Sequence, residues 1–158
     1  MSNESLTPRD TPVEQGQPAP EFTLPDQHRN QHTLASLLEA GPLALSFYPF
    51  DFTSTCTTEM ECLSSDIARF SDRSITAVGI SCDSPACHKA FAEAHDLDIT
   101  LLSDLHRHVC RAYGFYWPEM NVASRGTVVV APDRRIAWVQ ARELGDALST
   151  DEILAHVS

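Results

Sequence analysis

Two short apolar runs, each followed by a helical pattern, constrain the fold more than any other feature of this chain. Leu43–Phe50 and Ser74–Cys82 are dominated by apolar and small side chains, as in strands that are buried on both faces. A helical pattern occupies Thr53–Phe70 after the first run, and a second begins at Pro85 after the second run. Strands that alternate with helices favour a sheet with parallel neighbours and helices packed on it.

The first helical segment has its apolar residues on one face. They step by 4, 3, 4 and 3 residues along the chain, at Cys56, Met60, Leu63, Ile67 and Phe70. Thr53 is the expected N-cap of this helix. The second helix has Ser84 as its expected N-cap and Pro85 at its first position.

The rest of the chain adds three further strands and two further helices. We expect strands at Thr100–Leu102, Thr127–Ala131 and Ile136–Ala141, and helices over His106–Tyr113 and after the capping box Ser149–Glu152. The order predicts an α/β fold with a central mixed β-sheet flanked by helices on both faces. Residues 1–15 are polar and are expected to form a flexible, solvated tail, with one domain over residues 16–158.

Charge and composition exclude several function classes. The chain has 158 residues with 22 acidic and 11 basic side chains, for a formal net charge of -11. Binding to nucleic acid or to an anionic membrane surface needs the opposite charge, so neither is expected. No stretch approaches the ~18 apolar residues of a spanning helix, and the N-terminus lacks a signal-peptide core, so a cytoplasmic location is expected. The five cysteines would be reduced there.

Cys56 is the strongest candidate for chemistry. It lies in the first turn of a helix that follows a buried strand, where unpaired N–H groups and a partial positive charge favour a thiolate. A thiolate can attack a disulfide, an electrophilic carbon or the O–O bond of a peroxide. Thr53 can face the same point, and Pro49 can exclude water from it. By position alone, Cys56 fits equally well as a residue that only fills the apolar face.

The spacing Pro49-x-x-x-Thr53-x-x-Cys56, within FYPFDFTSTCTTEM, resembles the active-site motif of the peroxiredoxins. GQPAPEFTLPD at residues 16–26 resembles the opening segment of that family, and SRGTVVVAPD resembles the strand that carries its arginine, here Arg125. The resemblance extends over residues 16–158. It implies a thioredoxin-like fold and a thiol peroxidase that uses no metal or other cofactor and reduces hydrogen peroxide and organic hydroperoxides.

The resemblance also implies roles for individual residues. Cys56 would be the nucleophile and pass through a sulfenic acid. Thr53 would hydrogen-bond the peroxide and the thiolate, Pro49 would shield them, and Arg125 would hold the sulfur charged and orient both oxygens. Glu59 occupies a position where many members carry an acid that orients the arginine, although a solvated first-turn carboxylate is an equal alternative. A strand antiparallel to Leu43–Phe50 would begin at the sheet edge where Cys56 lies, so Arg125 can reach it.

Three possibilities remain for the cysteine that resolves the sulfenic acid. Cys87 lies in the first turn of the second helix, expected at the same sheet edge as Cys56 and activated like it, and some peroxiredoxins carry their resolving cysteine on this helix. Cys62 is six residues after Cys56, whereas the PrxQ group often has five, and the two lie ~120° apart around the helix. The chain could also have no internal partner. Cys82 and Cys110 are expected to be buried apolar residues.

The remaining expectations concern partners and rival functions. The spacing of cysteines and histidines matches no common zinc motif, so no metal is expected and the histidines are expected at the surface or at caps. The reductant would be thioredoxin or a similar dithiol protein, and the chain a monomer or homodimer. The main alternative is a peroxide-sensing thiol switch or thiol-regulated binding protein. A general disulfide reductase is disfavoured because the first helix lacks a C-x-x-C.

Overall fold

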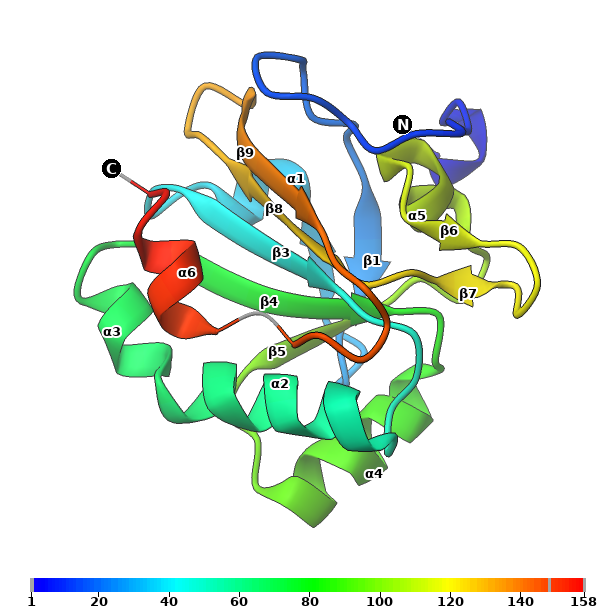
Figure 1. The fold of residues 1–158 in the computed structure, drawn as a ribbon. Coiled ribbons are helices and arrows are strands. Elements are labelled where there is room, and N and C mark those ends of the chain that lie inside the picture. Colours follow the sequence, from blue (N-terminus) through cyan, green and yellow to red (C-terminus); the bar gives the residue numbers. More distant parts are fainter. Residues whose placement is uncertain (1, 148, 158) are drawn as a thin grey trace.

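A five-stranded mixed sheet forms the centre of the computed structural model, which describes residues 2–147 and 149–157 (Figure 1). The strand order is β5-β4-β3-β8-β9. The bounds are β3 (Leu43–Phe47), β4 (Thr76–Ser81), β5 (Thr100–Ser103), β8 (Gly126–Val130) and β9 (Ile136–Ala141). β3, β4 and β5 run parallel, whereas β8 is antiparallel to β3 and to β9. The predicted mixed α/β sheet is therefore confirmed.

Helices cover both faces of this sheet (Figure 1). One face carries α2 (Ser54–Ser65), α3 (Ile67–Ser71), α4 (Pro85–His95) and α6 (Thr150–Leu154). The other carries α1 (Leu34–Leu37), α5 (His108–Tyr113), β1 (Thr23–Pro25) and β2 (Gln31–Thr33). Side chains alternate along β3, so that Phe47 packs into one apolar cluster and Tyr48, directly after the strand, packs into the other.

Two helices differ from their predicted bounds. The segment predicted as one helix breaks at Asp66 into α2 and α3. Polar side chains at the break compete with helical hydrogen bonding, and the Ser64 hydroxyl accepts from the backbone N–H of Asp98 at 2.5 Å. The helix α5 begins at His108 rather than His106, because Arg107 adopts a left-handed backbone with φ of 63°.

The N-terminal segment contacts the domain at a few points, although most of its described residues are exposed. It contains a short 3₁₀ helix, η1 (Asn3–Ser5), and runs beside α5. The N–H of Val13 donates to the carbonyl of Tyr113 at 3.0 Å, and Val13 is only 1% exposed. The expectation of a solvated tail fails at Val13, whose side chain is buried, while the flexibility of the tail stays a prediction. The domain boundary at residue 16 stays a prediction.

The topology brings three chain segments to one edge of the sheet. β3 and β4 are parallel, so α2 and α4, which follow them, both begin at this edge. Phe47 at the end of β3 pairs with Gly126 at the start of β8, which places Arg125 at the same edge, as expected. A side chain at position 126 would meet the Phe115 ring, since a Cβ there would lie 2.0 Å from it.

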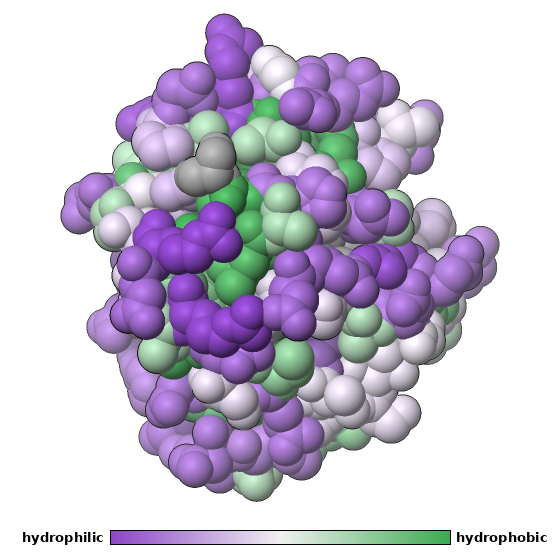
Figure 2. Space-filling model, turned by 60° about the vertical axis from the view of Figure 1, so that its left-hand side comes forward, coloured by the Kyte–Doolittle hydropathy of each residue, from purple (hydrophilic) through white to green (hydrophobic). Residues whose placement is uncertain are grey.

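Much of the molecular surface is hydrophilic. On the face shown in Figure 2, hydrophobic residues gather in a narrow strip between hydrophilic ones. Among the described residues, no helix is long and apolar enough to cross a lipid bilayer. A hairpin of β6 (Tyr116–Trp117) and β7 (Val122–Ala123) completes the elements and lies beside α5.

Candidate active site

Cys56 is the third residue of α2, in the first turn as expected. The residue is 2% exposed and belongs to the apolar cluster that also contains Met60 and Tyr48. The turn is closed by the N–H of Thr57, which donates to the carbonyl of Thr53 at 2.8 Å. The sulfur therefore lies at a helix start, where the N–H groups favour negative charge, and is almost fully covered by its surroundings.

A buried guanidinium lies against this sulfur. The Nη2 group of Arg125 donates to Cys56 Sγ at 2.8 Å, and its Nη1 group donates to Glu59 Oε1 at 2.7 Å. Its Nε donates to the carbonyl of Leu144 at 3.0 Å. Arg125 is 2% exposed and Glu59 is 1% exposed. One fork of donors thus spans the sulfur and a carboxylate, with water largely excluded.

The ion pair fixes the electrostatics of the site. A cation in contact with a thiol favours the thiolate, and the low dielectric of the interior strengthens that effect. Glu59 offsets the charge of Arg125 and holds its guanidinium in place. The alternative interpretation of Glu59 as a solvated carboxylate is wrong, because the first turns of α2 face the sheet rather than solvent on this side.

Pro49 and Thr53 both precede Cys56 in the sequence and differ in exposure. Pro49 is buried just beyond β3, whereas Thr53 is exposed at the N-cap position of α2. The Thr53 hydroxyl donates to the carbonyl of Phe50 at 2.8 Å and makes no capping bond to the helix. Thr53 is therefore the N-cap residue of α2, as predicted, but its hydroxyl bonds the preceding loop instead of capping the helix.

The loop before α2 holds an unusual backbone conformation. Phe52 has φ of 67°, in the left-handed region that a bulky side chain rarely adopts. Its ring packs against Phe91 of α4 with 5.1 Å between centroids. Such strain persists only where the surroundings fix the chain, so contacts with α4 hold this loop in position beside the candidate site.

A buried hydrogen-bond network supports the same loop. The Tyr48 hydroxyl donates to Asp51 Oδ1 at 2.6 Å, and His88 Nδ1 lies 2.7 Å from Asp51 Oδ2. His88 Nε2 donates to the carbonyl of Leu102 at 2.9 Å. Burial, followed by the charge of Asp51, raises the pKa of Tyr48 well above its usual value. The network ties the loop after β3 to α4 and β5.

The sequence pattern does not predict this network. The histidines are expected at the surface or at caps, whereas His88 is fully buried, with both ring nitrogens engaged. One signal was available: His88 lies three residues before Phe91, on the apolar face of α4. That pattern indicates burial, but it does not identify Asp51 as the partner.

Cys87 is also the third residue of its helix, α4, but its surroundings differ from those expected. It is half-buried, and its Sγ lies 3.9 Å from Asp83 Oδ1. Burial, together with the charges of Asp51 and Asp83, raises the pKa of the Cys87 thiol to about 12. The expectation that Cys87 is exposed and activated like Cys56 is therefore wrong, because carboxylates rather than a guanidinium face it.

The three other cysteines have partners other than Arg125. The Cys62 sulfur points toward α6 and lies 3.9 Å from Thr150 Oγ1. Cys82 and Cys110 are buried with their sulfurs 3.8 Å apart, which confirms the prediction that both are core residues.

Two groups of side chains have the spacing of metal ligands. They are Cys82, Asp104 and Cys110, and Asp51, Asp83 and Cys87, with the candidate ligand atoms of each group within 4.8 Å of one another. Asp104 already accepts from the N–H groups of Val109 and Cys110. Asp83 accepts from Ser81 and from a backbone N–H. Protein donors thus already engage the carboxylates of both groups, and an ion is not needed to satisfy them.

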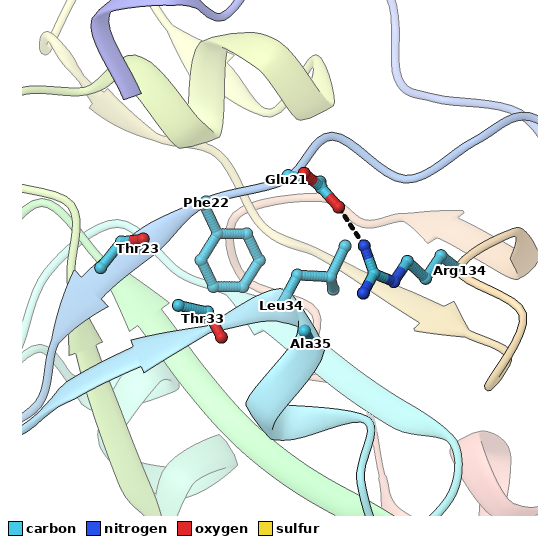
Figure 3. A pocket seen from close by; sticks show the side chains of 7 residues that line it. All are labelled: Glu21, Phe22, Thr23, Thr33, Leu34, Ala35 and Arg134. Carbon is cyan, nitrogen blue, oxygen red and sulfur yellow. Dashed lines mark hydrogen bonds and ion pairs between the residues drawn. The ribbon is translucent and has the colours of Figure 1, made fainter. Parts of the chain in front are cut away.

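A cavity of about 250 Å³ lies on the other face of the sheet (Figure 3). It is lined by residues around β1, the end of β2 and α1, including Phe22 and Leu34, whose side chains belong to the cluster opposite Cys56. An ion pair between Glu21 and Arg134 borders it. Its lining contains no thiol, so this cavity is unsuited to thiol chemistry.

Comparison with known proteins assigns the family. The model of the AhpC/TSA family matches residues 15–139. The chain belongs to the AhpC/TSA family. Among its relatives, this AhpC/TSA protein is 33% identical over 146 residues to alkyl hydroperoxide reductase E of Mycobacterium tuberculosis, covering 89% of this chain and 95% of that protein. It is 37% identical over 102 residues to the chloroplastic peroxiredoxin Q of Populus jackii, covering 65% of this chain and 47% of that one.

Solved structures agree with this assignment. The crystal structure of peroxidoxin BcpB from Mycobacterium tuberculosis superimposes with a TM-score of 0.79 at 30% identity, covering 84% of this chain and 90% of that one. This AhpC/TSA protein has the thioredoxin-like fold of the peroxiredoxins and is a thiol-dependent peroxidase. The family, fold class and enzyme class predicted from its sequence are confirmed.

Proposed function

We propose that Cys56 is the thiolate with which this peroxiredoxin reduces hydrogen peroxide and organic hydroperoxides. The contact of 2.8 Å between Arg125 Nη2 and Cys56 Sγ carries the proposal. Of the five cysteines, Cys56 alone has a hydrogen bond from a guanidinium among the contacts of the described residues. That contact supplies what peroxide reduction needs, a sulfur held as an anion beside a fixed donor.

The chemical step follows from this geometry. The Cys56 thiolate attacks one peroxide oxygen, an S–O bond forms and the O–O bond breaks. The leaving alkoxide or hydroxide takes a proton and departs as alcohol or water, and the sulfur is oxidised by two electrons to a sulfenic acid. Negative charge moves from sulfur to the leaving oxygen during this step. The Nη2 group of Arg125 already donates to the sulfur, so little reorganisation is needed to stabilise this charge.

Three neighbouring residues assist peroxide reduction in the proposed mechanism. Thr53 lies at the start of α2, and its hydroxyl can turn from the carbonyl of Phe50 to a bound peroxide. Pro49 is buried between β3 and α2 and shields the site. Glu59 is a positioning residue, since it acts through its ion pair with Arg125.

Cys87 is the proposed resolving cysteine. Its support is topological: α2 and α4 begin at the same sheet edge, with each cysteine at the third helical position. In this step the Cys87 thiol loses its proton, an S–S bond forms with Cys56, and the sulfenic oxygen leaves as water. A thioredoxin-like dithiol then returns two electrons and becomes a disulfide itself. Such a cycle suits a reducing compartment such as the cytoplasm.

A single-turnover experiment tests the peroxidase proposal. The pre-reduced chain should consume one equivalent of hydrogen peroxide rapidly, and Cys56→Ser should abolish this consumption. Cys62→Ser, which removes a thiol on the same helix, is the matched control and should retain it. Consumption that survives in Cys56→Ser would overturn the proposal. Repeated turnover with thioredoxin separates an enzyme from a thiol switch, which would react once and stop.

A further inference from the structure

Cys56 and Cys87 occupy equivalent positions but face opposite charges. Each is the third residue of a helix that follows one of two neighbouring parallel strands. The helix starts therefore favour a thiolate to a similar degree at both positions. The side chains around them do not: Cys56 accepts a hydrogen bond from Arg125, whereas Cys87 lies 3.9 Å from the Asp83 carboxylate.

The Asp83 carboxylate is fixed in its position. Its Oδ2 accepts from the Ser81 hydroxyl at 2.6 Å and from the N–H of Asp51 at 2.9 Å. These two donors hold one oxygen, so the other remains directed at the Cys87 sulfur. Asp83 immediately precedes Ser84, the N-cap of α4, whose hydroxyl accepts from the N–H of Cys87. The carboxylate and the thiol thus belong to one rigid turn.

Asp51 adds a second carboxylate from the loop after β3. A carboxylate oxygen of Asp51, one of Asp83 and the Cys87 sulfur all lie within 4.8 Å of one another. Tyr48 and His88 each bond one oxygen of Asp51. Within the part of the chain that the structure describes, no hydrogen bond or ion pair joins Asp51, Asp83 or Cys87 to a lysine or arginine. Burial and these charges together disfavour the thiolate, in line with the raised pKa of Cys87.

We propose that Asp83 determines which of the two cysteines reacts with peroxide, by keeping Cys87 as a neutral thiol while Cys56 reacts as a thiolate. The inference rests on the proposed function in taking Cys56 as the thiol that is oxidised first. A neutral thiol reacts poorly with peroxides, because the thiolate is the nucleophile. Cys87 is thereby spared direct oxidation and stays available for the Cys56 sulfenic acid.

Alkylation in a Cys56→Ser background tests this role of Asp83. Iodoacetamide reacts with thiolates, and peptide mass spectrometry reports the rate at Cys87 alone. Asp83→Asn should raise that rate at pH 8 about tenfold or more, because each unit of pKa changes the thiolate fraction tenfold. Asp83→Glu retains the charge and should stay slow. Glu93→Gln, an exposed carboxylate on α4, is the matched control and should also stay slow. A rate unchanged by Asp83→Asn overturns the proposal.

A second measurement needs no change at Asp83. Should Asp83→Asn fail to fold, the alkylation rate of Cys87 is followed against pH in Cys56→Ser alone. The alkylation rate of Cys87 should keep rising beyond pH 10. A rate that levels off above pH ~8.5, the pKa of an ordinary thiol, overturns the proposal. Neither alkylation experiment uses peroxide. Failure of the proposed role of Asp83 is therefore distinguishable from failure of the peroxidase function, which the single-turnover experiment measures.

Discussion

At the scale of single residues, Arg125 connects the candidate nucleophile to a buried carboxylate and to a second chain segment. Its guanidinium donates to the Cys56 sulfur, to the Glu59 carboxylate and to the carbonyl of Leu144. The three acceptors come from α2 and from the loop after β9. A buried charge that loses a partner costs more than the pair contributes, so these contacts depend on one another.

The shape of the guanidinium is testable by Arg125→Lys. Lysine keeps the charge but lacks the fork of donors, so it cannot serve both Cys56 and Glu59. The single-turnover rate with hydrogen peroxide should fall about 10²-fold or more, as for loss of one preorganised donor. Stopped-flow measurement checks this. Arg134→Lys, at the exposed pair with Glu21, should leave the rate unchanged. A wild-type rate in Arg125→Lys would show that peroxide reduction does not need the paired donors of the guanidinium.

The ion pair also predicts a stability effect at Glu59. Glu59→Ala leaves the buried Arg125 short of a counter-charge and should lower the free energy of unfolding by about 3–5 kcal/mol. Glu93→Ala, on the exposed side of α4, should change it by less than ~0.5 kcal/mol. Urea denaturation measures both. Equal stabilities of the two variants would show that the pair contributes little.

At the scale of elements, the starts of α2 and α4 control the proposed redox cycle. The Cys56 and Cys87 sulfurs are held by different partners, Arg125 and Asp83. A disulfide requires Cα atoms within ~7 Å and suitable side-chain directions. We therefore expect both first turns to open before the bond forms, with their amide hydrogens exchanging faster in the oxidised protein.

Non-reducing peptide mapping tests this pairing. After one equivalent of peroxide, the map should contain a Cys56–Cys87 bridge, because these two cysteines share a sheet edge. The Cys62 sulfur faces α6, so it is not expected in the bridge. A Cys56–Cys62 bridge, or overoxidised Cys56 without any bridge, would reject the assignment of Cys87.

At the scale of the whole molecule, buried phenols and thiols determine the alkaline limit of stability. Burial raises the pKa of Tyr48 and Tyr113, and burial with neighbouring carboxylates raises that of Cys87 to about 12. In the unfolded chain these groups titrate near ~8.5–10. Above that range the unfolded state releases protons that the folded state keeps, so the fold loses stability as pH rises.

The urea concentration at the midpoint of unfolding should therefore fall steadily as the pH rises from 8.5 toward 11. Tyr113→Phe removes one phenol that stays protonated in the fold, so it should flatten the fall. Tyr116→Phe, at a half-buried position in the β6–β7 hairpin, should not. A midpoint that is constant or rises over this range would contradict the assigned pKa directions.

The sequence predicted those parts of the fold that depend on local patterns. Apolar runs predicted β3 and β4, the motif spacing led to Cys56, and a second matching stretch led to Arg125, 69 residues further along the chain. Which groups face one another was harder to predict, because a pattern identifies the buried face but not the partner across it. The Asp51–His88 contact joins residues 37 apart, and no period connects them.

The same limit explains the error at Cys87. Its helical position was predicted correctly, but the sign of the nearby charge depends on how the turn at Asp83 folds back onto it. The N-terminal segment was misjudged at Val13 for a related reason. A single valine and a few backbone hydrogen bonds dock it, and neither stands out in a polar composition.

Trapping of the sulfenic acid shows which cysteine peroxide oxidises. The reduced chain is treated with one equivalent of hydrogen peroxide in the presence of dimedone, which reacts with sulfenic acids, and the adduct is located by peptide mass spectrometry. We expect a single adduct, on Cys56, formed within the time in which the peroxide is consumed. An adduct on another cysteine, or peroxide consumption with Cys56 left unmodified and unbridged, would contradict it.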